Sequence, residues 1–445
     1  MLLALATVFS ISACAQQGNS NQGTADNTTS AEGETDENGF NYNEAKNDPN
    51  TLIWMSHYDL NPTGNTERSA ELALFEDTYG GKIVYNQTTW DGRFDDLATA
   101  IVSDQSPDIF PYEWIAFPSG IMKGQYQPID DLVDWTDPKW AGMLDEADAY
   151  LYKGQHYIAP YEIIESLLLI YDRTLIQEEG LKDPYELYEN GEWTWDEFKS
   201  MMQTFCQGGE DRIGCMNAFG RSMVMSTGQT FVTYDGEKFI NNVRNADLGR
   251  VQEFLSSLAK EGLTGNGEYL AVSQAMVKGN VLFYGSGNWD IDMAIKAGNA
   301  IDHEIFVVTM PRDPQSDELY VAENLQAHMW VAGSTKKDLV KTWFDCLRTV
   351  KTDEEYVAKA KEDQLANTLW TSEIYDAVMD IRSDKFKKVF DYGYGVSDAM
   401  STIIEELYNC CCFDNEANTG WANISESYAG TMDGYIDEVN ARFGE

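Results

Sequence analysis

The first folded stretch of the chain alternates apolar runs with amphipathic segments. Short apolar runs at 51–55, 82–85 and 108–110 are typical of β-strands. Between them, apolar residues recur at helical spacing over 67–79 and again over 94–101. This order of strand, helix, strand, helix and strand predicts a parallel α/β layer. In such layers a ligand crevice lies at the carboxyl ends of the strands.

The middle of the chain repeats this alternation. Residues 167–171 form an apolar cluster with the length of a buried strand. Thr194-Trp195-Asp196-Glu197 is a capping box, in which the threonine hydroxyl accepts from the Glu197 amide and the glutamate reaches back. Further helices are expected over 251–258 and after Lys336. The chain shows no internal repeat and no heptads. The alternation of strands and helices predicts an α/β fold.

The N-terminus is apolar, and the segment after it is polar. Residues 1–11 are too short to span a bilayer as a mature helix and are typical of the apolar part of a signal peptide. They end in Ile11-Ser12-Ala13-Cys14, which resembles the bacterial lipobox, whose cysteine receives diacylglycerol. Residues 15–50 are mostly small and polar, which is typical of a flexible tether. We therefore expect a lipoprotein signal peptide over 1–14, a linker over 15–50 and lipid on Cys14.

Length and charge narrow the possible classes of function. With 445 residues, the chain is too long for one compact core, which favours two domains or lobes. The formal net charge is −43, from 74 acidic and 31 basic residues. Such a surface repels nucleic acid and keeps an exported protein soluble. A preference for cationic ligands is the weaker interpretation of the same charge.

The cysteines and histidines do not predict a metal site. Cys206 and Cys215 bracket a short loop that a disulfide could close. Cys410, Cys411 and Cys412 are consecutive and do not make a Cys-x-x-Cys knuckle. The chain has four histidines and no His/Cys spacing typical of zinc. We expect neither a metal ion nor a cofactor.

Several short motifs occur in one order along the chain. They are FEDTYGGKI from Phe75, SPDI from Ser106, YQPIDDL from Tyr126, YKGQHYIAP from Tyr152, LIYDR from Leu169, WTWDEF from Trp193, GNV from Gly279, GNW from Gly287 and VVTMP from Val307. Together they resemble the family 1 extracellular solute-binding proteins of bacteria, which are similar to the maltose-binding protein. The resemblance runs from about residue 50 to about residue 350.

The resemblance implies a periplasmic-binding-protein-like fold, with two α/β lobes, a hinge and a ligand cleft between the lobes. The chain is expected to cross between the lobes near 160–166, 321–326 and 350–355. The expected lobes are 51–163 plus 322–350 for the first and 164–321 plus 351–445 for the second.

Sugars have flat apolar faces and a rim of hydroxyl groups, so proteins hold them with aromatic rings and with carboxylates or amides. In the first lobe, the resemblance implies ligand contacts at strand ends from Tyr58, Asp59, Trp90, Glu113 and Trp114. The alternatives are a plain turn at Tyr58 and Asp59, which precede Asn-Pro, and core packing for Trp114.

Four further candidates come from the crossing segment and the second lobe. Tyr161 and Glu165 lie on the first crossing, where they would contact ligand from both lobes. The alternative for Glu165 is a salt bridge at the hinge. Asn288 and Trp289 follow Gly287, and Trp289 matches a Gly-x-Trp stacking position of the family, with core packing as its alternative. The tryptophans expected in the core are Trp54, Trp193, Trp195 and Trp330.

The resemblance implies the substrate-binding component of a bacterial ABC importer, lipid-anchored outside the cell. It would capture a sugar or oligosaccharide and deliver it to permease subunits in the membrane. We expect a monomer that binds no nucleic acid and is not an enzyme. One alternative is an exported glycoside hydrolase, which needs two carboxylates about 5–10 Å apart. Another is a binding protein for peptides or polyamines, which Asp59, Glu113 and Glu165 would suit.

Replacing Cys14 tests the expected lipid anchor. The Cys14→Ser protein should leave the membrane fraction, because a polar tether offers no other attachment. Cell fractionation and mass spectrometry of the N-terminal peptide measure this. Unchanged membrane association, together with an unmodified Cys14 in the parent protein, would contradict the expectation.

Overall fold

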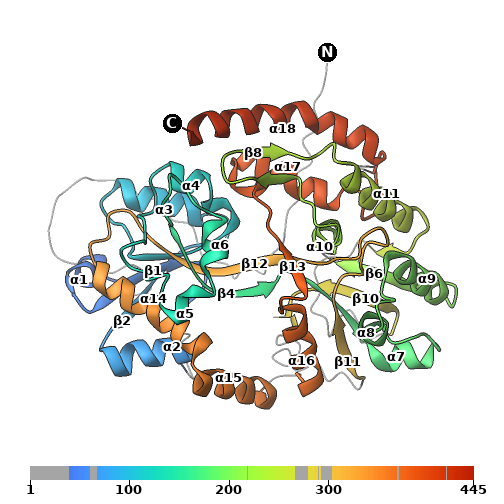
Figure 1. The fold of residues 1–445 in the computed structure, drawn as a ribbon, viewed down its shortest axis with the longest axis horizontal. Helices are drawn as coiled ribbons and strands as arrows, with labels where there is room; N and C mark the ends of the chain where they lie inside the picture. The colour runs from blue at the N-terminus through green and yellow to red at the C-terminus, as the bar shows by residue number, and fades with distance from the viewer. Residues whose placement is uncertain are drawn as a thin grey trace, which may run out of the picture.

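The protein has two lobes that lie side by side, each built around its own mixed β-sheet (Figure 1). The computed structural model describes residues 40–60, 68–217, 219–265, 279–288, 290–291, 303–367, 370–416 and 418–444. The N-terminal elements make the first lobe, on the left of Figure 1, and the second lobe lies on the right. The predicted fold of two α/β lobes is confirmed.

The first sheet carries the three parallel strands that the sequence predicts. β1 runs parallel to β2 and β3, whereas β12 is antiparallel to β3 and β4 and parallel to β13. Every residue of β1 is buried, as expected for a strand of a sheet covered on both faces. The strands are β1 (Thr51–Ser56), β2 (Lys82–Gln87), β3 (Ile109–Pro111), β4 (Ile158–Glu165), β12 (Leu319–Trp330) and β13 (Phe386–Val389).

Short helices surround this sheet. The helix expected over 67–79 is α2 followed by the π-helical segment η1, which together bury Leu72 and Phe75. The helical elements of this lobe are α1 (Tyr42–Asn47), α2 (Ala70–Ala73), η1 (Leu74–Thr78), α3 (Arg93–Val102), η2 (Trp114–Ala116), α4 (Ser119–Met122), α5 (Pro138–Ala141), α6 (Leu144–Asp148) and α14 (Lys337–Thr352).

Helix α1 lies inside the range 15–50, for which the composition predicts a flexible tether. Asn41 caps the helix by accepting from the Glu44 amide, and Ala45 is buried. The Tyr42 hydroxyl donates to the carbonyl oxygens of Asp104 and Ser106. These contacts attach residues 42–47 to the first lobe, so this part of the predicted linker is a helix that packs on the lobe.

The second sheet has the order β11-β5-β10-β6-β9, and β7 and β8 form a separate hairpin. Its elements are β5 (Leu168–Asp172), α7 (Arg173–Glu178), α8 (Pro184–Glu189), α9 (Trp195–Cys206), β6 (Ile213–Asn217), α10 (Gly220–Met225), β7 (Val232–Tyr234), β8 (Phe239–Asn241), α11 (Ala246–Lys260), β9 (Thr264–Gly265), β10 (Val281–Ser286) and β11 (Ile305–Val308). Helix α9 begins after Thr194 as predicted, but the threonine makes no side-chain cap. Its backbone instead bridges to Arg312, which orients the start of the helix.

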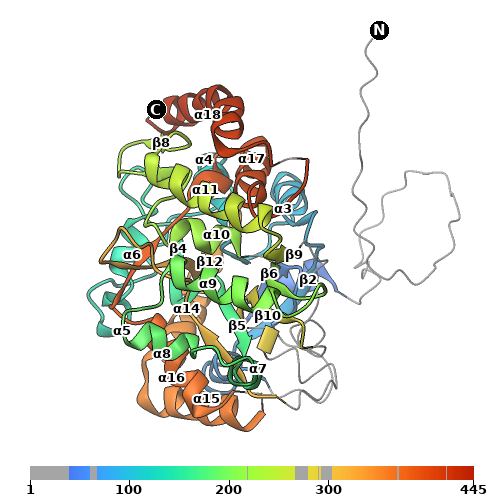
Figure 2. The same cartoon turned by 90° about the vertical axis from the view of Figure 1, so that its right-hand side faces the viewer.

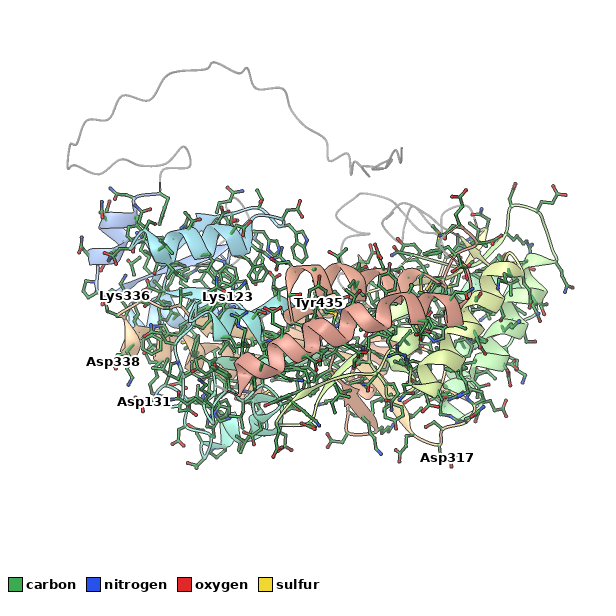
Figure 3. The ribbon with its side chains drawn as sticks, turned by 90° about the horizontal axis from the view of Figure 1, so that it is seen from above. Lys123, Asp131, Asp317, Lys336, Asp338 and Tyr435 are labelled. Atoms are coloured by element: carbon green, nitrogen blue, oxygen red, sulfur yellow. The ribbon has the colours of Figure 1, made fainter. Side chains whose placement is uncertain are left out.

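The C-terminal helices lie against both lobes. They are α15 (Glu354–Asn367), α16 (Ser372–Ile381), η3 (Gly393–Gly395), α17 (Asp398–Asn409) and α18 (Trp421–Phe443). Figure 2 shows α18 above α11 and α17, and Figure 3 shows it from above, with Tyr435 labelled near Lys123 of the first lobe. Its first residue, Trp421, packs on Phe231 of the second lobe, and its last, Phe443, packs on Phe117 of the first.

The large aromatic side chains pack where the sequence analysis expects. Trp54 and Trp330 are buried in the first lobe, and Trp193 and Trp195 are buried in the second. The disulfide that the spacing of Cys206 and Cys215 allows is not formed, since both thiols are free.

Strands β4 and β12 connect the two lobes through the centre of the molecule (Figure 1). They pair antiparallel from Glu323 opposite Glu165 to Met329 opposite Ile158. The ranges 160–166 and 321–326, where crossings are expected, overlap these two strands, and the range 350–355 covers the end of α14 and the start of α15. The three crossing positions stay predictions. The Glu165 side chain is fully buried at this crossing, and Arg382 donates to it from 2.6 Å.

Removing Arg382 tests this buried ion pair. Arg382→Met leaves the Glu165 charge without its partner, which costs about 3–5 kcal/mol of unfolding free energy. Urea unfolding measures the loss. Lys385→Met is the matched control, because the exposed Lys385–Asp380 pair is worth less than about 1 kcal/mol.

The double variant Glu165→Leu/Arg382→Met should recover most of the lost stability, because no charge remains buried. Equal, small losses in Arg382→Met and Lys385→Met would show that the buried pair does not stabilise the crossing.

Candidate functional site

Three loops of the first lobe meet at one edge of its sheet. Strands β2, β1 and β3 are parallel neighbours and end at Gln87, Ser56 and Pro111. Because the carboxyl ends of parallel strands lie on the same edge, the residues that follow them are brought together. These residues are His57, Tyr58, Trp90, Glu113 and Trp114.

Exposed aromatic rings form a platform at this edge. The His57 ring lies edge-to-face against Tyr58, at 5.0 Å between ring centres, and against Trp90, at 4.7 Å. Tyr58 is 40% exposed and Trp90 53%, unusually high for side chains of this size. The Trp54 indole N–H donates to the Tyr58 carbonyl oxygen at 2.9 Å and holds the loop. The platform therefore offers apolar ring surface to a ligand.

An ion pair lies beneath the platform. Arg93, the first residue of α3, donates through Nε to Glu113 at 2.6 Å, and its guanidinium lies 3.8 Å from the centre of the Trp90 ring. Burial raises the pKa of Glu113, and Arg93 opposes the rise. Burial and the charge of Arg93 both lower the pKa of His57, so its imidazole is neutral at pH 7.

Two buried polar atoms beside the ion pair lack a hydrogen-bond partner among the described residues. Within the described part of the chain, neither His57 Nδ1 nor Glu113 Oε1 makes a hydrogen bond, although both are buried. They lie 3.8 Å apart. A neutral imidazole nitrogen and a carboxylate oxygen can accept from ligand hydroxyls, and doing so satisfies groups that are costly to bury unpaired.

The second lobe and η3 supply the opposite wall. Arg221 of α10 places its guanidinium 4.2 Å from the centre of the Trp114 ring and 5.3 Å from that of Tyr394. The Tyr394 hydroxyl donates to Glu405 of α17 at 2.7 Å. Trp114 therefore contacts the second lobe directly, and the two walls meet at this residue.

Two cavities lie at the boundary between the lobes. The first, of about 570 Å³, is lined by Trp90, Glu113 and Trp114 of the first lobe and by Tyr394 and residues of α17. The second, of about 480 Å³, is lined by the start of α2, by Glu162 and Arg382 of the crossing region and by Asn288 after β10. Both have the size of a small-molecule site, and both draw residues from either side of the boundary.

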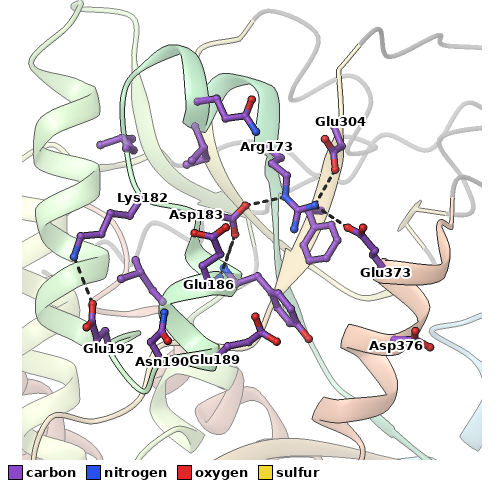
Figure 4. Close-up of a pocket in the computed structure, with 16 residues that line it drawn as sticks. Arg173, Lys182, Asp183, Glu186, Glu189, Asn190, Glu192, Glu304, Glu373 and Asp376 are labelled. Carbon is purple, nitrogen blue, oxygen red and sulfur yellow. Dashed lines mark hydrogen bonds and ion pairs between the residues drawn. The ribbon is translucent and has the colours of Figure 1, made fainter.

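A further cavity, of about 940 Å³, lies elsewhere, on the second lobe between α7, α8, β11 and α16 (Figure 4). Its acidic side chains surround Arg173, which pairs with Asp183, Glu304 and Glu373 at 2.8–3.1 Å. These pairs tie neighbouring elements together. We assign this network a structural role, because its central cation, the partly buried Arg173, is paired with three carboxylates.

Comparison with known proteins identifies the family. Residues 72–371, about two thirds of the chain, match the model of the bacterial extracellular solute-binding proteins. The chain belongs to this family. The predicted family resemblance is confirmed, and membership places the protein outside the cytoplasm.

Individual relatives of this solute-binding protein are distant. The diacetylchitobiose binding protein DasA of Streptomyces coelicolor is 23% identical over 287 residues, which are 61% of this chain and 64% of the relative. The match thus spans less than two thirds of that relative's length.

Solved structures agree on the fold. The sugar-binding protein MalE from Xanthomonas citri superposes with a TM-score of 0.63 at 16% identity, over 88% of this chain and 98% of its own. UgpB from Mycobacterium tuberculosis, solved with glycerophosphocholine, gives a TM-score of 0.63 at 16% identity, over 87% of this chain and 98% of its own.

The structure brings some of the predicted site residues together. Trp90, Glu113 and Trp114 line one cavity, and Tyr58 adjoins them through His57. Asp59 follows in the same loop and is half-buried.

The other candidates lie apart from this cavity. Tyr161, on β4, packs edge-to-face on His328. Glu165 forms a salt bridge with Arg382, and a salt bridge at the hinge is the alternative considered for it above. Asn288 lines the second cavity, and Trp289 lies outside the described residues.

Sequence analysis missed His57, Arg93 and Arg221. His57 could have been found, because it directly follows β1 at the edge where Tyr58 was expected. Arg93 lies on the nearby Trp90 ring, but its pairing with Glu113 depends on the fold. Arg221 gave no local signal, since the Trp114 and Tyr394 rings that it contacts come from distant parts of the chain.

The described residues contain no group of three or more His, Cys, Asp or Glu side chains arranged to hold a metal ion. Among the same residues, no helix combines the length and apolar character needed to cross a bilayer.

Truncating Trp90 tests the platform. Trp90→Ala should raise the Kd of the ligand about thirty-fold, equivalent to about 2 kcal/mol, because an exposed stacking ring is lost. The fold should persist, since the ring is half exposed. Calorimetry measures the affinity, and Tyr79→Ala, an exposed aromatic that lines neither cavity, is the control. Equal affinities in the two variants would remove Trp90 from the site.

Proposed function

We propose that this protein is the substrate-binding component of an ABC importer that captures a carbohydrate outside the cell. The ligand occupies the boundary between the lobes and passes intact to permease subunits in the membrane. The protein acts as a monomer held to the membrane by lipid on Cys14. Trp90, Tyr58 and Trp114 contact sugar faces, and His57 and Glu113 contact hydroxyls.

One observation carries this proposal: exposed aromatic rings stand directly beside two unpaired polar atoms, His57 Nδ1 and Glu113 Oε1. A sugar matches this arrangement, since it presents an apolar face next to hydroxyl groups. The relatives support the ligand class, because diacetylchitobiose is named as the ligand of DasA and MalE is named a sugar-binding protein.

The hydrolase alternative requires two carboxylates that face one bond. In the first cavity, Glu113 is engaged by Arg93 and Glu405 by Tyr394, so both accept hydrogen bonds from the protein. The charge of Glu113 is thus neutralised by Arg93, and only its Oε1 remains without a hydrogen bond. Binding without cleavage is therefore the proposal that this geometry favours.

A cationic ligand is the second candidate. The first cavity is lined by Asp91, Asp95, Asp398 and Glu406 in addition to Glu113 and Glu405, against one lining cation, Arg93. This balance favours a polyamine or a basic peptide over an anion. The glycerophosphocholine bound by UgpB likewise carries a quaternary ammonium group.

A thermal-shift screen separates these candidates. The panel contains chitobiose derivatives, malto-oligosaccharides, glycerophosphocholine, spermidine and basic peptides. We expect a glycan to raise the melting temperature, because a ligand that binds only the folded state stabilises it. Chromatography after prolonged incubation should then recover the glycan uncleaved.

Cleaved glycan would establish the hydrolase instead. Stabilisation by spermidine or peptides, with none by any glycan, would replace the carbohydrate with a cationic ligand.

A further inference from the structure

Three consecutive thiols follow helix α17, the helix that contributes Glu405 and Glu406 to the first cavity. Cys410 is half-buried, whereas Cys411 and Cys412 are fully buried. The sulfur atoms of Cys410 and Cys411 lie 3.7 Å apart. Both residues lie in the turn after the helix, and this turn brings the sulfur atoms of two adjacent residues close together.

The pKa values of the two thiols are shifted in opposite directions, upward for Cys410 and downward for Cys411. The Cys410 thiol donates toward Cys411 and toward the Leu407 carbonyl oxygen. The hydrogen bond from Cys410 lowers the pKa of Cys411; burial opposes the change, and the charge of Lys260 assists it. A thiolate is the nucleophile in disulfide exchange, so the lowered pKa of Cys411 favours its attack on a mixed disulfide formed at Cys410.

The same turn contacts the helix that carries Arg221. A methyl group on Gly220 would approach Cys412 Sγ to 2.5 Å and would also collide with the Tyr408 carbonyl oxygen. The first residue of α10 therefore rests directly on the cysteine turn. Arg221 is the next residue, and its guanidinium lies on the Trp114 and Tyr394 rings of the candidate site.

We propose that Cys410 and Cys411 form a reversible disulfide that modulates ligand binding through α10 and Arg221. The modulation rests on the proposed function, whereas the disulfide itself does not. Closing the bond draws the two sulfur atoms together and alters the turn on which Gly220 rests. Because no side chain separates Gly220 from that turn, the displacement passes to Arg221 and to the wall of the cleft.

The oxidant is a small-molecule disulfide. The half-buried Cys410 thiol loses its proton, attacks one sulfur of the oxidant, forms a mixed disulfide and releases one thiol. The Cys411 thiol then loses its proton, attacks Cys410 Sγ and releases the second thiol. One disulfide is reduced to two thiols as the protein dithiol is oxidised, so electrons and protons balance.

The bond would be easily reversed. Consecutive Cα atoms are about 3.8 Å apart across a trans peptide bond. Disulfides usually join Cα atoms about 4.4–6.8 Å apart, and deviation from this range makes the bond more reducible. Strained disulfides of this kind are the labile ones suited to regulation.

The test uses the full chain, reduced, purified and then incubated with oxidised glutathione. After acid quenching and alkylation, peptide mass spectrometry should find a fragment in which neither Cys410 nor Cys411 is alkylated. Its mass should be that of the dithiol fragment minus two hydrogens. Dithiothreitol should restore both thiols. The product should be absent from Cys410→Ser and Cys411→Ser and retained in Cys346→Ser, which removes a buried thiol of α14 in the first lobe.

Exclusive glutathionylation of Cys410, a bond from Cys412 to Cys215, or no oxidation would each overturn the disulfide. Calorimetry on the reduced and the oxidised protein tests the coupling to ligand binding. The Kd should be about two- to fivefold higher after oxidation, which corresponds to the free energy of one cation–π contact. Equal affinities would overturn the coupling and leave the disulfide standing. If no carbohydrate binds either form, the proposed function fails, and the mass measurement still decides the disulfide.

Discussion

The antiparallel pairing of β4 with β12 is the constraint on which the rest of the structure depends. These two strands run through the boundary between the lobes and share backbone hydrogen bonds along most of β4. Where the pairing begins, Glu165 is buried against Arg382 from α16, so a C-terminal helix is fixed to the same crossing. The crossing keeps the carboxyl ends of β1, β2 and β3 turned toward the second lobe. The other features of the candidate site depend on that orientation.

At this edge of the sheet, an arginine side chain lies beneath an aromatic ring and pairs with a carboxylate. Arg93 neutralises Glu113 and lies on one face of Trp90, while the ring remains half exposed. On the other wall, Arg221 lies on Trp114 in the same manner. Guanidinium groups support both indoles, so the rings are held in place before ligand arrives. Preorganised rings lose little conformational freedom on binding, which favours affinity.

The elements that could be predicted from the sequence are those with a local signal. The strand and helix alternation over 51–110 appears in the chain as apolar periodicity, and it placed Trp90, Glu113 and Trp114 at strand ends, where the structure gathers them. The helix α1 escaped prediction because polar residues make it, and tertiary hydrogen bonds from Tyr42 stabilise it. The partners of Glu113 and Glu165 are Arg93 and Arg382, and the second of these is more than two hundred residues away in sequence. Pairings at such separations depend on the tertiary fold, which no local pattern encodes.

The most direct test of the account is the size of the molecule with and without ligand. If ligand binds between two lobes that are joined by β4 and β12, it contacts both walls and favours the closed arrangement by its difference in affinity for the two states. Small-angle scattering of the purified protein, with the stabilising glycan at saturation, should therefore give a smaller radius of gyration than the free protein. Tight binding with an unchanged radius of gyration would contradict closure of the two lobes around the ligand.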